Sequence, residues 1–465
     1  MPTSPPIHTI ETPSLGNRSY VVVGKGEAIV IDPPRDLDRV QAVLDEVGAR
    51  AVLVVETHRH ADYLTGGLTL ARQSRARYAV AADPELVFDH VPVHDGDVLE
   101  AAGFELRALH TPGHTPHHIS YALSQHGQEI AVFTGGSLLY GAVGRTDLVD
   151  PELTAKLSAD QYHSAHRLAA ELPDDTLIYP THGFGSFCSA GASTETDSST
   201  IAAERRTNAA LTANSVEDFV AELLTGYDAY TAYYAHMPVL NAAGPGPIDL
   251  SPPVLVDAGG LRRALEDGSW VVDLRTRAAY ADGHLAGTFS FGIEGNMAVY
   301  LGWLIPWGTP VVLLGESADQ VADAQRELAR IGIDRPVGAA FGSPTDWADS
   351  PGRERSFRRV DFTDLAAERQ RRADLVVLDV RRNLEWSQSH LPGAVHIPLQ
   401  ELQARLDDVP DADEVWVHCG TGYRAAASAA LLEQAGRRVV LIDDAYADAE
   451  SKGNPLVRPD EQNNR

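Results

Sequence analysis

The sequence predicts an α/β protein of about three domains, each built from sheets with helices packed on their faces. Short apolar runs that suit strands alternate with amphipathic segments along the chain. A length of 465 residues exceeds what one hydrophobic core usually serves. A motif that recurs in the C-terminal half indicates two small α/β domains of one kind, with mostly parallel sheets.

The N-terminal part is expected to hold two sheets covered by helices. Residues 20–32 predict a hairpin around a glycine turn, and residues 36–48 predict a helix. Further short strands are expected around 78–82, 104–109, 119–123 and 130–133. Helices over 199–213 and 215–236 are expected to close this domain, the second with Ser215 at its start.

Composition excludes several classes of protein. The net charge of -27 disfavours nucleic acid and anionic membranes as partners, and the hydrophobic content of 44% excludes general disorder. The start of the chain lacks a basic segment followed by an apolar core, and no apolar run approaches the roughly 20 residues that span a bilayer. We therefore expect a cytoplasmic protein. Cys188 and Cys419 lie far apart in sequence, which favours reduced thiols over a disulfide.

Histidines follow several apolar runs of the N-terminal part. The segment AVLVVETHRHAD covers residues 51–62. Within it, one residue separates His58 from His60 and one separates His60 from Asp62, so on extended backbone the three side chains project to one side. His114 and His182 also follow strand-like segments. Because such side chains converge at strand ends, the pattern predicts a metal-derived site. The alternative is that single histidines serve as hydrogen-bonded loop residues.

The C-terminal half repeats itself. WVVDLRTRAAYADGHLAGT, from residue 270, resembles VVLDVRRNLEWSQSHLPGA, from residue 376, and each copy continues as strand, helix, strand and helix. Proline and glycine concentrate before the first copy without periodicity, which indicates a linker. The expected domains are 1–237, a linker over 238–253, 254–350 and 351–465.

The two copies differ at one position. Cys419 directly follows an apolar strand in the second copy, whereas Gly315 stands there in the first. A cysteine between a strand end and a helix start lies among unpaired N–H groups at the positive end of the helix dipole, which stabilises its thiolate. Gly420 and Gly422 allow the loop to curl its amides toward the sulfur, and Arg424 adds positive charge. The alternative is a packed structural cysteine. A thiol walled off from solvent and faced by no amide would contradict the prediction.

The repeat resembles the rhodanese-family sulfurtransferases over roughly residues 254–345 and 357–450. The resemblance rests on LDVR with HLPGAVHIP and on the loop CGTGYR. It implies that Cys419 carries sulfane sulfur as a persulfide, with Arg424 assisting. It also implies that the residues Gly420, Thr421, Gly422 and Tyr423 bind substrate, that thiosulfate or sulfite is a reactant, and that the first copy is inactive. Related phosphatases have five residues between cysteine and arginine, while this loop has four and suits a single sulfur atom.

Residues 1–237 resemble the metallo-β-lactamase fold, an αββα sandwich, on THRHAD, HTPGHTP, GRTDL and PTHG. Within that fold they look most like persulfide dioxygenases, which share DGDVLE, HISY and a segment like HGFGSFC. The resemblance implies oxidation of glutathione persulfide to sulfite at a mononuclear ferrous site. Arg145 would lie by the thiol substrate and grip a glutathione carboxylate, or else pair with Asp147 within its loop. Cys188 would relay sulfur or be packed.

Two departures from that family affect the metal. Tyr63 stands where most hydrolases of this fold have a histidine, and Gly136 replaces an aspartate that binds iron in the dioxygenases. The expected metal ligands are His58, His60 and His114, with Asp62 and His182 as less favoured candidates. Asp62 is otherwise expected to orient a ligand, and His182 to be idle or to hold a water. Ferrous iron is expected, or alternatively zinc or no metal.

Three functions stay open at this point. The first joins a persulfide dioxygenase-like domain to a sulfurtransferase that uses Cys419. The second is a zinc hydrolase of thioesters such as acyl-glutathione, and the third is a metal-free sulfur-binding scaffold with rhodanese activity only. Small thiols and persulfides such as glutathione persulfide are the expected partners, and a homo-oligomer is left open.

Overall fold

The computed structural model describes residues 7–190 and 196–459, and its contacts divide the chain into two compact units. The first unit comprises Met1–Ile248 with Ala329–Gly332, and the second comprises Asp249–Leu328 with Ile333–Arg465. The boundary at Ile248 falls inside the expected linker, 238–253. Within the described part of the chain, no helix has the length and apolar character needed to cross a membrane.

The first unit contains two six-stranded sheets. The first sheet runs in the order β1 (Ile7–Thr12), β2 (Asn17–Gly24), β3 (Glu27–Ile31), β4 (Arg50–Val55), β5 (Arg77–Ala81) and β6 (Val91–Val93). The second runs β14 (Ser199–Thr200), β12 (Leu177–Pro180), β10 (Gln128–Gly135), β9 (Ile119–Gln125), β8 (Phe104–His110) and β7 (Val98–Ala101). A short antiparallel pair joins β11 (Val143–Gly144) to β13 (Ser189–Ala190).

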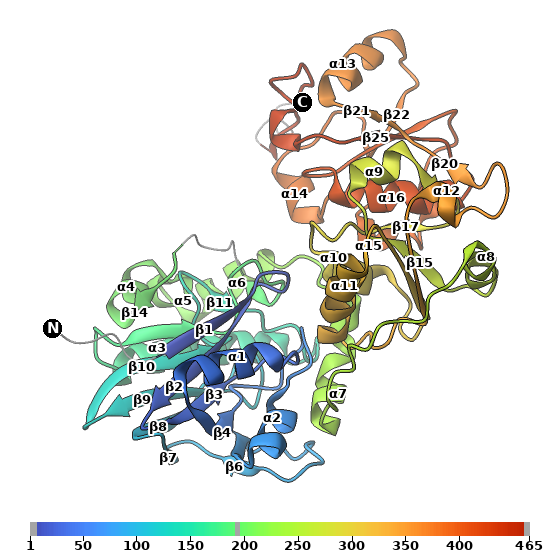
Figure 1. The fold of residues 1–465 in the computed structure, drawn as a ribbon. Helices are drawn as coiled ribbons and strands as arrows, with labels where there is room; N and C mark the ends of the chain where they lie inside the picture. The colour runs from blue at the N-terminus through green and yellow to red at the C-terminus, as the bar shows by residue number, and fades with distance from the viewer. Residues whose placement is uncertain (1–6, 191–195, 460–465) are drawn as a thin grey trace. The chain divides into compact units, whose positions relative to one another are not determined.

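Helices cover the outer faces of both sheets (Figure 1). They are α1 (Asp38–Val47) and α2 (Gly67–Ser74) on the first sheet, and α3 (Thr154–Glu171), α4 (Ile201–Thr207), α5 (Ala209–Thr212) and α6 (Val216–Thr225) on the second. Between the sheets lies a core to which each contributes one face, including Tyr20 and Leu53 from the first and Tyr121 and Phe133 from the second. The expected αββα sandwich is confirmed, because two half-apolar sheets bury their inner faces on each other.

The closing helices are shorter than the sequence predicts. The segment 199–213 breaks at Asn208, whose side chain caps α5 and binds the carbonyls of Leu139 and Ala142. Ser215 caps α6 as expected, but the helix ends at Thr225 instead of residue 236. The prediction of one helix over 215–236 is therefore wrong, because the chain turns at Gly226 and continues into the short 3₁₀ helix η1 (Ala232–Ala235).

The expected linker begins inside a helix, α7 (Met237–Ala243). Pro238 occupies the first turn of this helix, where its missing N–H costs nothing. Gly244 follows with φ 79, a conformation that glycine adopts without strain. Proline and glycine therefore stand at the two ends of a short helix in this segment, which we expected from the sequence to be an irregular linker.

The second unit contains two parallel sheets. One runs β17 (Phe289–Ser290), β15 (Trp270–Asp273), β18 (Val311–Gly315) and β19 (Gly338–Phe341). The other runs β23 (Val395–His396), β22 (Val376–Asp379), β24 (Val415–His418), β25 (Val439–Ile442) and β21 (Arg358–Val360). The two orders correspond strand for strand, and a parallel bridge from Leu255 to Ala339 takes the place of β21 in the first sheet. This correspondence supports the reading of two copies of one unit.

The helices of the second unit connect these strands. They are α8 (Ala258–Glu266), α9 (Arg277–Asp282), α10 (Met297–Leu304), α11 (Ala318–Arg330), α12 (Pro344–Trp347), α13 (Phe362–Arg371), α14 (Asn383–Gln388), α15 (Leu399–Leu402) and α16 (Tyr423–Gln434). The remaining short elements are β16 (His284–Leu285) paired with β20 (Glu354–Arg355), η2 (Leu406–Asp408) and η3 (Tyr446–Asp448). The outcome is two α/β bodies with parallel sheets, as the sequence predicts.

The strand register identifies the position in the first copy that corresponds to the cysteine. Asp273 of β15 pairs with Leu314 of β18, and Asp379 of β22 pairs with His418 of β24. The next residues are Gly315 and Cys419. Only the second copy therefore presents a thiol at this strand end.

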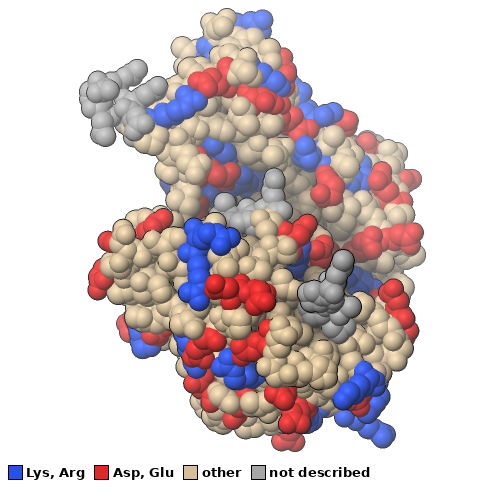
Figure 2. Space-filling view, turned by 90° about the vertical axis from the view of Figure 1, so that its left-hand side faces the viewer, with Lys and Arg blue, Asp and Glu red and all other residues tan. Residues whose placement is uncertain are grey.

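Acidic and basic side chains are interspersed over the face shown in Figure 2. Many of the arginines lie beside carboxylates, as in the pairs of Arg107 with Glu129 and of Arg167 with Asp95. Such exposed pairs contribute little to stability individually, and they leave the excess of acidic residues to set the net charge of -27.

Candidate functional site

Three buried histidines meet at the strand ends of the first unit. His58 follows β4, His114 follows β8 and His182 follows β12. One nitrogen from each of them lies within 4.8 Å of the others, and His58 Nε2 is 3.2 Å from His182 Nε2. Convergence at the ends of strands from both sheets is what the sequence pattern predicts.

Hydrogen bonds fix the tautomer of two of these rings. His114 Nδ1 donates to the carbonyl of Arg145 at 2.6 Å, which leaves a lone pair on Nε2. Asn17 Nδ2 donates to Asp62 Oδ2 at 2.7 Å, so Asn17 Oδ1 is free to accept from His182 Nδ1 at 2.9 Å. The Nε2 lone pairs of both rings are thus available to a cation, as is usual for histidine ligands.

The described residues fit a resident metal. His114 Nε2 is buried and has no hydrogen-bond partner, and neither has Asp62 Oδ1. Burial is the main cause that lowers the pKa of His114 to about 3, and the neighbouring His182 is the second. Burial, with a smaller contribution from His60, holds the pKa of His58 well below its ordinary value. Both rings are therefore neutral at physiological pH, the form that binds a metal.

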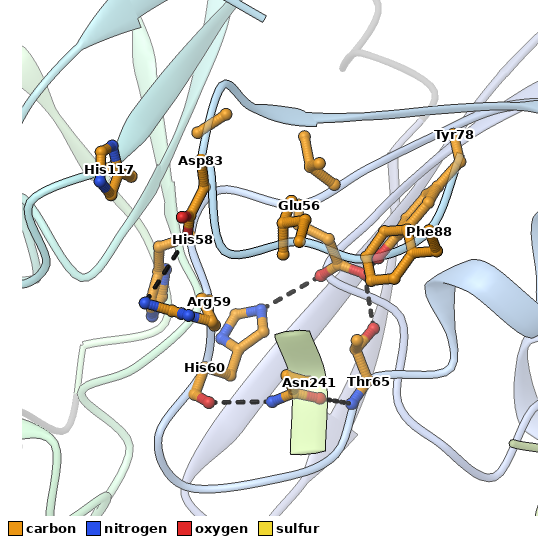
Figure 3. A pocket seen from close by; sticks show the side chains of 13 residues that line it. Glu56, His58, Arg59, His60, Thr65, Tyr78, Asp83, Phe88, His117 and Asn241 are labelled. Carbon is orange, nitrogen blue, oxygen red and sulfur yellow. Dashed lines mark hydrogen bonds and ion pairs between the residues drawn. The ribbon is translucent and has the colours of Figure 1, made fainter. Parts of the chain in front are cut away.

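His60 has other partners. Its Nε2 lies 3.2 Å from Glu56 Oε2 and 3.4 Å from Asp32 Oδ1 (Figure 3 shows the contact with Glu56). Burial alone would lower the pKa of His60, but Asp32 and Glu56 raise it to about 10. One nitrogen of His60 also groups with Asp62 and His182 within 4.8 Å.

Within the described residues, the structure thus gathers His182, and not His60, with His58 and His114. The set of His58, His60 and His114 stays a prediction. Two buried carboxylates hold His60 Nε2, while His60 Nδ1 is buried without a hydrogen-bond partner among the described residues, so His60 stays a candidate ligand beside Asp62 and His182. Asp32 follows β3 and Glu56 follows β4, so both could have been found as acids at strand ends near the histidines.

The two departures from the family pattern have clear structural consequences. A Cβ at Gly136 would lie 2.3 Å from His114 Cδ2, so the ring of His114 fills the space that an aspartate side chain would need. Tyr63 is buried, donates to the carbonyl of Asp32 at 3.2 Å and stacks on the ring of His60 at 4.4 Å. Neither position offers a metal ligand.

Asn241 is a site residue that no sequence motif marks, and it lies in the expected linker. Its Nδ2 donates to the carbonyl of His60 at 2.9 Å, and its Oδ1 accepts from the Thr65 amide at 3.1 Å (Figure 3). The same Nδ2 donates to the carbonyl of Tyr63 at 2.9 Å. Helix α7 therefore holds the loop that carries the histidines.

A cavity of about 390 Å³ lies beside the histidine loop. Its lining includes Ala61, between His60 and Asp62, and Thr115, next to His114. Tyr230 and Tyr234 supply aromatic surface, while Arg59 at the wall pairs with Glu85. A volume of this size suits a small organic thiol.

The side chain of Arg145 is engaged by its own unit. Its guanidinium donates to Asp147 Oδ1 at 2.9 Å, to Asp147 Oδ2 at 2.7 Å and to the carbonyl of Asp228 at 2.6 Å. This is the loop-stabilising alternative of the two sequence interpretations. Arg145 acts on the site through its backbone carbonyl, which orients His114. Cys188 is fully buried, and its carbonyl accepts from the Arg145 amide at 2.8 Å.

In the second unit, Cys419 is the residue that follows β24, at the mouth of the loop that leads to α16. The Gly422 amide donates to Cys419 Sγ at 3.1 Å, and Gly422 has φ 101, which favours glycine. The residue Cys419 is only 1% exposed. One loop amide therefore donates to the sulfur, as expected. Cys419 is more deeply buried than we expect for a thiol that exchanges sulfur with small molecules.

Arg424 is bound within its own domain. Its guanidinium donates to the two oxygens of Glu385 at 2.6 and 2.7 Å, in a bidentate pair. Burial alone would raise the pKa of Glu385, but the hydrogen bond and charge of Arg424 lower it to about 2. The charge of Arg424 is thus balanced, and the pair ties α14 to the start of α16.

The fold and these sites define the class of protein. Residues 14–182 match the family model of the metallo-β-lactamase superfamily, and residues 362–452 match that of the rhodanese-like domain. The chain belongs to the metallo-β-lactamase superfamily, and it carries a rhodanese-like domain in its C-terminal part.

Particular relatives refine this assignment. The chain is 33% identical over 199 residues to the mitochondrial persulfide dioxygenase ETHE1 of Homo sapiens, a match that covers 42% of this chain and 70% of that protein. It is 31% identical over 177 residues to a hydroxyacylglutathione hydrolase of Tolumonas auensis, covering 36% and 62% respectively. A crystal structure of a metallo-beta-lactamase from Staphylococcus aureus subsp. aureus COL superposes with a TM-score of 0.65 at 26% identity, covering 73% of this chain and 99% of that one. An ETHE1-like domain joined to a rhodanese-like domain points to sulfur metabolism.

Proposed function

We propose that the chain is an enzyme of persulfide metabolism, in which a persulfide dioxygenase-like domain is coupled to a sulfurtransferase that uses a Cys419 persulfide. The observation that carries this proposal is the 3.1 Å hydrogen bond from the Gly422 amide to Cys419 Sγ at the start of α16. A donor aimed at a sulfur atom at a helix N-terminus stabilises the anionic forms that transfer requires.

The transfer consists of two displacements on sulfur. The Cys419 thiolate attacks the outer sulfur of thiosulfate, the S–S bond of thiosulfate breaks, and sulfite leaves with the bonding electron pair. An acceptor such as cyanide then attacks the outer sulfur of the Cys419 persulfide, thiocyanate forms, and the thiolate is regenerated. Neither step requires an oxidant. The Gly422 N–H holds the negative charge at Sγ, while Glu385 and Arg424 keep the loop and α14 together.

In the first unit, His58, His114 and His182 would hold a metal through their Nε2 atoms. Ferrous iron bound there would supply the redox chemistry with O₂ that oxidation of glutathione persulfide to sulfite requires. The protein's own part is to orient the rings: the Arg145 carbonyl holds His114, and Asn17 holds His182. The cavity lined by Tyr230 and Tyr234 would receive the thiol part of the persulfide.

A zinc hydrolase of thioesters is the second candidate, supported by the 31% identity to a hydroxyacylglutathione hydrolase. Such hydrolysis commonly uses a metal-bound water and benefits from two metals. Tyr63 stands where a histidine ligand of a second metal would be. A metal-free scaffold that delivers sulfur to Cys419 is the third candidate, and the unpartnered Nε2 of His114 counts against it.

Two measurements test the proposal. Purification without added metal or chelator, followed by elemental analysis and oxygen uptake with glutathione persulfide, separates the candidates for the first unit. Iron with oxygen uptake supports the dioxygenase, zinc with thioester cleavage supports the hydrolase, and no metal supports the scaffold. For the second unit, thiosulfate:cyanide transfer is expected in the wild type and absent in Cys419→Ser. Transfer retained by that variant would remove the assignment.

A further inference from the structure

Helix α16 is held by the cysteine-less copy at both ends. At its start, Tyr423 Oη donates to the carbonyl of Gly292 at 2.8 Å. At its end, Glu433 pairs with His284 Nε2 at 3.0 Å, and Gln434 Nε2 donates to the carbonyl of Gly287 at 3.3 Å. The helix that begins in the Cys419 loop therefore rests on the other copy, which has no thiol of its own.

Arg277 of that copy reaches the loop itself. Arg277 is the first residue of α9, and its Nε donates to Asp443 Oδ1 at 2.6 Å. A Cβ placed on Gly422 would lie 2.9 Å from Arg277 Nε and 2.4 Å from Asp443 Oδ1. The ion pair thus packs directly against the backbone of Gly422, whose N–H binds Cys419 Sγ.

Arg277 also lies within electrostatic reach of Cys419. Burial alone would lower the pKa of Arg277. The hydrogen bond and charge of Asp443 outweigh burial and raise this pKa, with smaller contributions from Glu294 and Cys419. The arginine is only one-third exposed, and Asp443 occupies its Nε, so it is placed to hold the loop rather than to bind a substrate.

We infer that the cysteine-less copy positions the sulfur-transfer loop of its neighbour, with Arg277 as the positioning residue. The Arg277–Asp443 pair fixes Gly422 in its left-handed conformation, and that conformation aims the amide at Cys419 Sγ. This explains physically why a copy without a thiol remains useful to the chain. The inference rests on the proposed role of Cys419 and adds to it a residue from the other copy.

A matched control is available, because a second arginine binds the same carboxylate. Arg359 Nη1 donates to Asp443 Oδ2 at 3.3 Å, and Arg359 belongs to β21 of the cysteine-bearing copy. No Arg359 atom is among the three nearest to the Cβ position of Gly422. Arg359→Gln therefore removes a partner of Asp443 without removing the packing on the loop.

The test compares Arg277→Gln, Arg277→Lys and Arg359→Gln in the full chain. In thiosulfate:cyanide transfer, Arg277→Gln is expected to lower kcat by about tenfold or more, with KM changed by less than about twofold, because a misplaced group costs the chemical step most. Arg359→Gln is expected to stay within about twofold of the wild type. Arg277→Lys keeps the charge but lacks the Nε donor, and is expected to fall between the two.

Equal effects of Arg277→Gln and Arg359→Gln, or none from either, would overturn the inference. Should Arg277→Gln fail to fold, Arg277→Lys decides by the same comparison. The rate of Cys419 alkylation by iodoacetamide gives a readout that needs no transfer activity: it should change several-fold in Arg277→Gln and not in Arg359→Gln. If Cys419→Ser retains transfer, the proposed function fails, while the alkylation rates still test the positioning role of Arg277.

Discussion

His58 Nε2 and His182 Nε2 face each other at 3.2 Å, although the two residues lie at the ends of strands in different sheets of the first unit. Thr57 Oγ1 donates to Asp32 Oδ2 at 2.7 Å and so can accept from His58 Nδ1 at 2.8 Å. Asn17 Oδ1 accepts from His182 Nδ1 at 2.9 Å. With these Nδ1 atoms donating, the two Nε2 lone pairs face each other, an arrangement that a shared cation would satisfy. The pair lies where strands of the two sheets together form the candidate metal site.

Loss of His182 is therefore expected to empty the site. His182→Ala should lower metal content at least about tenfold, because one of three gathered nitrogens is lost. Elemental analysis of the purified variant measures this. His94→Ala, at a side chain that is 66% exposed, serves as the control and should keep its metal. A His182 variant with full metal content would show that His182 is idle, as the sequence alone suggests.

Asn17 is expected to act on the metal through His182. Asn17→Ala removes the acceptor of His182 Nδ1 and the donor to Asp62 Oδ2, which frees the ring to turn. Partners of this kind typically contribute about 10–100-fold to metal affinity. Competition with a chromophoric chelator would measure the change. Affinity equal to that of the wild type would show that the ring is held by packing alone.

Restoring the family's acid at position 136 is not expected to restore a ligand set by itself. The Cβ of Gly136→Asp would meet the ring of His114 at 2.3 Å, so either the ring or the backbone must shift. Overpacking of this kind costs about 1–3 kcal/mol. Thermal unfolding should thus show a lower transition temperature for Gly136→Asp and also for Gly136→Ala, which adds the same Cβ without the acid. A gain of metal in the aspartate variant at unchanged stability would mean that His114 moves freely.

The sequence alone located much of this site because histidines after apolar runs must come together when the runs form neighbouring strands. It could not rank His182 above His60. The environment of His182 depends on Asn17, which lies far away in the chain and orients its ring. The environment of His60 depends on Asp32 and Glu56, which hold its Nε2. Hydrogen bonds between distant residues leave no periodic trace in a sequence.

In the second unit too, some features could be predicted from the sequence and others could not. The repeated motif predicted two parallel-sheet bodies, and the strand register places Gly315 at the position of Cys419. The near-complete burial of Cys419 and the pairing of Arg424 with Glu385 were not foreseen. Both depend on how segments from α9, α14 and α16 meet around the loop, which is a matter of tertiary packing and not of local pattern.

The pairing of Glu385 with Arg424 predicts a specific response to acid. The pKa of Glu385 falls from 4.5 to about 2 on folding, so its carboxylate adds stability that is fully present above pH 4.5 and is lost as the pH falls toward 2. Glu385→Gln removes this titration but keeps a side chain of the same size. The urea concentration at the midpoint of unfolding should therefore decline more steeply between about pH 4.5 and 2 in the wild type than in the variant. Parallel declines would show that solvent already screens the pair, and that the tie between α14 and α16 depends on packing.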